Sequence, residues 1–127
     1  MASPTDLRYS PTHEWFRAQD DLVTVGITQH AADELTDVTF VETKAVGVAV
    51  AAGDSVGEVE SVKTTSDVFS VVSGTVAEVN PAVVADPSLV NSDPYGNGWL
   101  VRIRTTDLAP LKGLLDGATY DAQLAAH

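Results

Sequence analysis

Apolar and polar residues alternate over short stretches along most of this chain, and this period of two is typical of half-buried β-strands. In the clearest stretch, Val23, Val25 and Ile27 alternate with smaller or more polar neighbours. Similar runs predict further strands at residues 38–43, 46–50, 56–62, 68–72, 75–79 and 99–104. Turn sequences separate several of these runs, as at 52–54 and 73–74. The pattern predicts a mainly β protein.

Helical signals are few. Residues 28–35 fit two helical turns, with Thr28 as the N-cap and Leu35 on the apolar face. A C-terminal helical segment is predicted at about 107–125, where leucines recur at helical spacing and Gly117 would end the first helix. Tyr120 and Leu124 would form a last turn. With the strands, these helices predict a small β-sandwich or flattened barrel.

The length and charge of the chain limit what it can do. With 127 residues, we expect a single domain spanning 1–127. The net charge of −11 argues against binding to nucleic acid and favours encounters with basic surfaces of partner proteins. No apolar run approaches the ~20 residues of a membrane span. Because no signal or transit peptide is visible, we expect a bacterial cytoplasmic protein rather than a mature mitochondrial one.

No self-contained active site is visible. The absence of cysteine excludes disulfides, thiolate nucleophiles and cysteine metal ligands. The histidines, His13, His30 and His127, lack the spacing of a metal site. No nucleophile elbow or phosphate-binding loop occurs. We therefore predict no catalytic residue and no metal, so any redox chemistry has to come from an attached cofactor.

One lysine is unusual in its setting. Lys63 is the only lysine between Lys44 and Lys112, and it lies within an acidic stretch with apolar β-type segments on both sides. Small and polar residues surround it, so the tip of the hairpin predicted at about 56–72 would be exposed to solvent and accessible. Such a lysine can carry a cofactor through an amide bond. The spacing alone leaves open whether it is a carrier site or an ordinary surface lysine.

The sequence around Lys63 resembles the lipoyl-lysine segment of the glycine cleavage system H protein family. The resemblance covers nearly the whole chain, in blocks at residues 9–15, 25–28, 40–42, 60–67, 73–80 and 89–100. Biotin carriers differ, because they usually have methionine on both sides of the lysine, where this chain has Val62 and Thr64. The chain departs from the family pattern at 36–37, 43–44 and 70–72, which lie in predicted turns or loops.

The resemblance implies a barrel-sandwich hybrid, a flattened β-barrel of two antiparallel sheets, with a few short helices including a C-terminal one. It implies lipoate bound covalently to Lys63. The chain would be a carrier and not an enzyme: it would take the aminomethyl group of glycine from a pyridoxal-phosphate glycine decarboxylase (P protein) to a tetrahydrofolate-dependent aminomethyltransferase (T protein). Dihydrolipoamide dehydrogenase (L protein) would reoxidise the arm. A lipoyl-attaching enzyme is a further implied partner, and a monomer suits such a shuttle.

A loaded arm ends in a cationic amine, which calls for a carboxylate in a sheltered groove. The family segment near such a groove matches Thr12, His13 and Glu14, so we expect Glu14 to bind the amine with help from Thr12 or Asp67. The alternative is that Glu14 only occupies a strand surface. Glu60 is a candidate for recognition by the lipoyl-attaching enzyme, and its alternative role is solubility.

Two other functions remain open at this stage. The first is a related lipoyl relay or scaffold that donates lipoyl groups to other lipoyl domains without carrying the carbon of glycine. The second, an independent enzyme, is disfavoured because no set of base, nucleophile or metal ligands is present.

Overall fold

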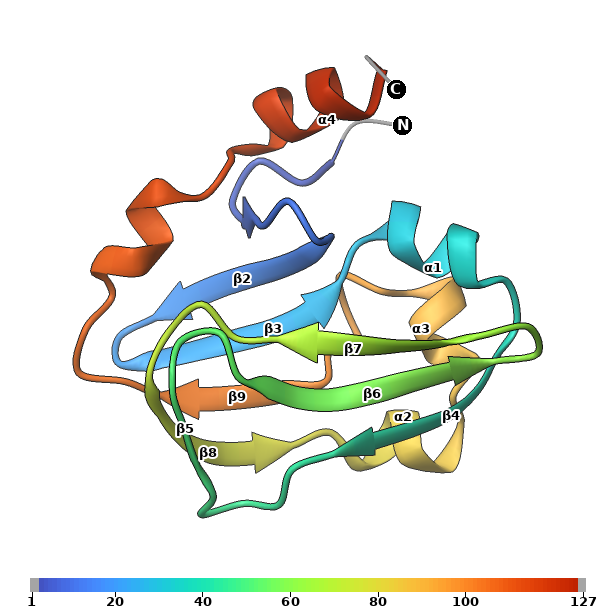
Figure 1. Cartoon of the computed structure of the whole chain (residues 1–127), viewed down its shortest axis with the longest axis horizontal. Coiled ribbons are helices and arrows are strands. Elements are labelled where there is room, and N and C mark those ends of the chain that lie inside the picture. The colour runs from blue at the N-terminus through green and yellow to red at the C-terminus, as the bar shows by residue number, and fades with distance from the viewer. Residues whose placement is uncertain (1–2, 126–127) are drawn as a thin grey trace.

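The computed structural model describes residues 3–125 and contains two antiparallel β-sheets (Figure 1). The larger sheet has six strands in the order β1-β2-β3-β9-β8-β5. Their bounds are Arg8–Tyr9 (β1), Glu14–Gln19 (β2), Leu22–Ile27 (β3), Ala49–Val50 (β5), Gly74–Val79 (β8) and Val101–Arg104 (β9). The smaller sheet has three strands in the order β4-β6-β7, with bounds Val38–Thr43, Ser55–Ser61 and Thr65–Phe69.

Short helices connect the strands. Helix α1, Gln29–Leu35, begins where the hydroxyl of Thr28 accepts a hydrogen bond from the N–H of Ala31 at 3.2 Å. Helices α2 and α3 span Pro81–Ala85 and Leu89–Ser92, and a short 3-10 helix spans Ala109–Gly113. Helix α4, Gly117–Ala125, ends the described chain. Figure 1 shows α1 above the tip of the β6–β7 hairpin and α4 beside the N-terminal segment.

Apolar side chains from both sheets form the main core. Val41, Val59 and Val68 of the small sheet are buried in one cluster with Val25 and other side chains of the large sheet. A second cluster consists of Leu7, Tyr9, Trp15 and Tyr120, and it fixes α4 against the edge of the large sheet. Burial of these side chains provides the driving force that holds the two sheets and α4 together.

The predicted fold class is confirmed: the protein is mainly β, with two antiparallel sheets and short helices that include a C-terminal one. Some local predictions are wrong. The strand expected at 68–72 lies at Thr65–Phe69. The strand expected at 46–50 is reduced to Ala49–Val50, because Gly47 takes a φ of 93° and Val46 is 62% exposed. Gly117 begins α4 instead of ending a helix, because Asp116 accepts a hydrogen bond from the N–H of Thr119 at 2.8 Å.

Another wrong prediction concerns Trp99. It was expected within the strand predicted at 99–104, but β9 begins at Val101. Trp99 instead packs against Arg102. The guanidinium carbon of Arg102 lies 4.0 Å from the centroid of the Trp99 ring, a distance at which a cation–π contact is favourable. Val101 and Ile103 do share the buried face, as their alternation predicts.

Candidate functional site

Lys63 lies on the tight turn between β6 and β7. The N–H of Ser61 donates to the carbonyl of Thr64 at 2.8 Å, which leaves Val62 and Lys63 as the two central residues of the turn. The Ser61 hydroxyl oxygen accepts from the N–H groups of Lys63 and Thr64 at 3.3 and 3.2 Å. The N–H of Val62 also donates to the carbonyl of Asp37 at 3.2 Å. The backbone of the turn is therefore fixed, while the Lys63 side chain is exposed.

A groove of about 530 Å³ lies beside this turn. We call it the α1 groove; it lies between α1, the loop that joins β1 to β2, and the hairpin. Its lining residues are Thr12, His13, Glu14, Ile27, His30, Ala31, Glu34, Leu35, Lys63, Thr64, Thr65, Ser66 and Asp67. The lysine and a buried carboxylate, 49 positions apart in sequence, thus line one groove.

Glu14 is the buried carboxylate of the groove, with only 1% of its surface exposed. The hydroxyl of Ser10 donates to Oε1 at 2.5 Å, and the hydroxyl of Thr12 donates to the same oxygen. The N–H of Phe69, on β7, donates to Oε2 at 3.4 Å. Within residues 3–125, no ion pair joins Glu14 to a basic side chain. Its hydrogen-bond partners are therefore all neutral.

Burial raises the pKa of Glu14, because taking the carboxylate out of water disfavours its charged form. The hydrogen bonds from Ser10 and Thr12, and that from the N–H of Phe69, oppose this shift because they stabilise the charged form. A carboxylate in this state gains from any cation that enters the groove, because the cation supplies the missing charge partner in a site with little water.

His13 precedes Glu14 in a left-handed backbone conformation, with a φ of 72°. Its Nδ1 lies 2.7 Å from the hydroxyl of Tyr120, and its ring centroid lies 4.7 Å from that of His30. Burial, together with the neighbouring His30, lowers the pKa of His13, whereas Glu34 opposes the shift. His13 is thus held by hydrogen bonds and ring contacts as part of the groove wall.

The structure places Lys63, Glu14, Thr12 and Asp67 around the same groove. Glu60 is not among the residues that line the groove, although Thr65, its neighbour across the small sheet, is. Sequence reasoning missed the residues that support the site. They are Ser10, which binds the Glu14 carboxylate, Ser61, which shapes the lysine turn, and Tyr120, which contacts His13.

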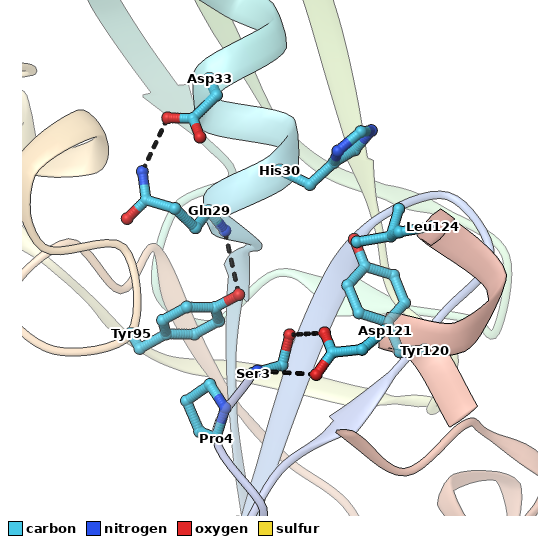
Figure 2. Close-up of a pocket in the computed structure, with 9 residues that line it drawn as sticks. All are labelled: Ser3, Pro4, Gln29, His30, Asp33, Tyr95, Tyr120, Asp121 and Leu124. Atoms are coloured by element: carbon cyan, nitrogen blue, oxygen red, sulfur yellow. Dashed lines mark hydrogen bonds between the residues drawn. The ribbon is translucent and has the colours of Figure 1, made fainter. Parts of the chain in front are cut away.

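A second hollow of about 520 Å³ adjoins the α1 groove, and Figure 2 draws its lining residues. His30 lines both. In the second hollow, the N–H of Gln29 donates to the hydroxyl of Tyr95 at 3.0 Å, and Ser3 donates to the carboxylate of Asp121 through its backbone N–H and its hydroxyl. The carboxylates of this hollow are thus already hydrogen-bonded.

Residues 3–125 contain neither a membrane-spanning helix nor a metal-binding cluster. Their helices are too short, or too polar, for any of them to pass through a bilayer. No cluster of three or more His, Asp or Glu side chains in this range is arranged to hold a metal ion.

Comparisons with known proteins agree with the geometry. The family model described as "Glycine cleavage H-protein" matches residues 7–127. A glycine cleavage system H protein of Acinetobacter baumannii is 51% identical over 124 residues, which cover 98% of this chain and 100% of the relative. One from Alteromonas mediterranea is 53% identical over 119 residues, covering 93% and 92%. The crystal structure of such a protein from Mycobacterium marinum has a TM-score of 0.89 and 41% identity, covering 97% of this chain and 99% of that one. The chain therefore belongs to the glycine cleavage H-protein family.

Proposed function

We propose that Lys63 carries the lipoyl group and that the α1 groove shelters the end of the arm when it is loaded with the aminomethyl group of glycine. Members of this family carry lipoyl-lysine and act in glycine cleavage as carriers, not as catalysts. What remains to be assigned in this chain is the attachment residue and the binding site for the loaded arm.

Three features of the turn support Lys63 as the attachment residue. The side chain is exposed, so a modifying enzyme can reach its amine. The turn is closed by backbone hydrogen bonds and by Ser61, so the lysine is presented on a rigid element. The residues that follow it, Thr64, Thr65 and Ser66, are exposed and small, so they leave room for an acyl group.

The observation that carries the proposal is the buried carboxylate of Glu14, which has only neutral hydrogen-bond donors within the described chain. When bound, the lipoyl group would supply the disulfide on which the aminomethyl group is carried. The amine of that group is cationic, so Glu14 can bind it through a charge-assisted hydrogen bond. Thr12 and Asp67, at the rim of the groove, are exposed and can assist.

The groove also limits access of water to this bound end. Ile27 and Leu35 are buried apolar side chains among its lining residues. A wall of this kind excludes water from the bound group and strengthens its pairing with Glu14. The chain's own residues therefore bind, orient and shield the carried group, while bond making and breaking belong to the partner enzymes.

Membership of the glycine cleavage system gives the chain three partner enzymes: glycine decarboxylase, aminomethyltransferase and dihydrolipoamide dehydrogenase. We propose in addition a lipoyl-attaching enzyme that recognises the Lys63 turn, with the partly buried Glu60 near its base as a candidate contact. We also propose a monomer in the bacterial cytoplasm that does not bind nucleic acid; its bacterial relatives and its net charge of −11 support this.

The attachment residue is tested by intact mass. After expression with a lipoyl-attaching enzyme, we expect the wild-type protein to gain the mass of one lipoyl group and Lys63→Arg to gain none, because arginine keeps the charge but cannot form the amide. Lys44→Arg is the matched control and should be modified like the wild type. A lipoyl adduct on Lys63→Arg would refute the assignment. An adduct that never takes up label from glycine would favour a lipoyl relay.

The role of Glu14 is tested with loaded protein. Glu14→Gln keeps the shape but removes the charge, so we expect the aminomethyl group to be lost about tenfold faster, since a hydrogen bond to a charged group contributes roughly 1.5 kcal/mol. Mass spectrometry over time measures the loss. Glu58→Gln changes an exposed carboxylate on β6 and should leave the rate unchanged. Equal rates for Glu14→Gln and wild type would remove Glu14 from the binding site.

A further inference from the structure

Three elements around the α1 groove meet at one hydroxyl group, that of Tyr120 on α4. This oxygen lies 2.7 Å from Nδ1 of His13, in the β1–β2 loop, and 2.8 Å from Oγ1 of Thr28, the N-cap of α1. Tyr120 is only 2% exposed, and it does not line the groove itself. A buried hydroxyl with two such partners fixes the relative positions of the loop and the helix.

His13 needs such support because its backbone is left-handed. A φ of 72° is unfavourable for a side chain other than glycine, and it persists only where the surroundings hold it. Its N–H donates to the carbonyl of Ser10 at 3.1 Å, and its carbonyl accepts from the N–H of Thr28 at 2.9 Å. The contact with Tyr120 anchors the side chain of the same residue.

The loop that His13 shapes also holds the carboxylate site. Ser10 and Thr12 donate their hydroxyl hydrogens to Glu14, and Ser10 Oγ accepts from the N–H of Glu14 at 3.0 Å. Ser10 and Glu14 are also joined by a backbone hydrogen bond of 3.0 Å. A change at His13 therefore moves the carboxylate and both of its hydroxyl donors together.

Helix α4 is well placed to act as the anchor. The Tyr120 ring stacks on that of Tyr9, with centroids 4.8 Å apart and planes 12° apart. Asp121, the next residue, accepts hydrogen bonds from Ser3, and Figure 2 shows this pair beside Tyr120 and opposite His30. The N-terminal segment and the large sheet thus fix the position of the hydroxyl.

We propose that Tyr120 is a positioning residue of the α1 groove: acting through His13, its hydroxyl holds the 10–14 loop in the conformation that presents Glu14 to the loaded arm. This inference rests on the proposed function of the groove and extends it to the C-terminal helix. The hydrogen-bond direction follows from the two groups. The pKa of Tyr120 is raised to about 12, so its hydroxyl keeps its proton and can donate to Nδ1 of His13 in the Nε2–H tautomer.

The first test uses the unmodified protein and needs no arm. Tyr120→Phe removes the hydroxyl and keeps the ring that stacks on Tyr9. We expect amide hydrogen exchange at Glu14 and Thr28 to become several-fold faster, because their acceptors, Ser10 Oγ and the His13 carbonyl, lie in the loosened loop. Exchange at Val101, in the centre of the large sheet, should not change.

The second test measures loss of the aminomethyl group from loaded protein. Tyr120→Phe and His13→Ala should each speed the loss several-fold, and combining them should add little, because both break one contact. His13→Asn should restore the wild-type rate, because asparagine tolerates the left-handed conformation and its Oδ1 can accept from Tyr120. Thr24→Val, which removes a hydroxyl on β3 that lines neither hollow, is the control and should behave as wild type.

The outcomes separate this inference from the proposed function. A wild-type rate for Tyr120→Phe beside a fast Glu14→Gln would overturn the positioning role alone. A His13→Asn variant as fast as His13→Ala would overturn it as well, since the accepting side chain would then be irrelevant. If Glu14→Gln loses the aminomethyl group no faster than the wild type, the binding role of Glu14 fails. The positioning role is then still tested by amide hydrogen exchange, and unchanged exchange at Glu14 and Thr28 in Tyr120→Phe would refute it.

Discussion

Glu14 is a carboxylate in a place where most proteins put an apolar side chain. It is fully enclosed between Ser10, Thr12 and the edge of β7, and no basic side chain of the described chain pairs with it. Burial of a charge without a charge partner costs free energy of folding. The unloaded protein therefore carries a local instability that a bound ammonium group would relieve.

This cost predicts a gain in stability for Glu14→Gln in the unloaded protein. The pKa of Glu14 is raised in the folded state, so the folded protein holds the proton of Glu14 more tightly than the unfolded chain does. The stability gained in this way is complete below the ordinary pKa of 4.5, and it is lost as the pH rises through the folded pKa. At pH 7 we expect Glu14→Gln to be more stable by about 1 kcal/mol, and the advantage should shrink towards pH 4. Urea denaturation of both proteins at the two pH values measures this. A glutamine variant less stable than wild type at pH 7 would contradict it.

At the scale of residues, the sequence was informative where chemistry is concentrated in one side chain. A family motif surrounds both Lys63 and Glu14, which is why the sequence singled them out, and the structure places both at one groove. Tyr120 was assigned only to a helical turn, because the contact between Tyr120 and His13 joins positions 107 residues apart. Such a contact depends on the packing of α4 against the large sheet, and local patterns carry no information about that packing.

The β6–β7 hairpin is the element that presents the lysine. Ser61 shapes its tip, because its hydroxyl oxygen accepts from the N–H groups of Lys63 and Thr64, and the hydroxyl hydrogen points to the carbonyl of Thr64 at 3.2 Å. Val62, beside the lysine, is 68% exposed and packs against nothing that would fix the turn. The rigidity of the tip therefore depends on these polar contacts more than on burial.

Removal of the Ser61 hydroxyl should affect modification more than stability. We expect Ser61→Ala to be lipoylated several-fold more slowly, because the lysine turn becomes mobile, while the free energy of unfolding changes by less than about 0.5 kcal/mol at this partly exposed site. Ser61→Thr keeps the hydroxyl and serves as the control. The initial rate of mass gain with a lipoyl-attaching enzyme, and urea unfolding, measure the two effects. Equal rates for Ser61→Ala and wild type would count against the role of Ser61.

At the scale of elements, strands with strict alternation were predicted well and those governed by distant partners were not. The alternation in β9 matches its burial, whereas β3 is buried on both faces from Val23 to Ile27, which its alternating sequence did not predict. Strands β1 and β2 were missed, because they hold consecutive buried residues such as Trp15 and Phe16. Helix α2 was missed although Asn80 caps it and Pro81 occupies its first turn, since five residues are too few for a periodic pattern.

The whole molecule combines a rigid β core with a strongly acidic surface. The charge of −11 suits a protein that meets several partners in turn, because electrostatic attraction speeds encounter without requiring a large permanent interface. Part of this charge is concentrated on the small sheet, where Glu42, Glu58 and Asp67 lie opposite one another on adjacent strands. The net charge follows from the composition alone, whereas this row of like charges could be recognised only from the register of the strands.

Strand β7 forms one edge of the small sheet, and an uncovered strand edge is a template on which a second chain can add a strand and begin to aggregate. The carboxylate of Glu14 accepts a hydrogen bond from the N–H of Phe69 at this edge. The carboxylate therefore removes one of the hydrogen-bond donors that a foreign strand would need. A single buried side chain thus helps to protect this strand edge from pairing with a second chain.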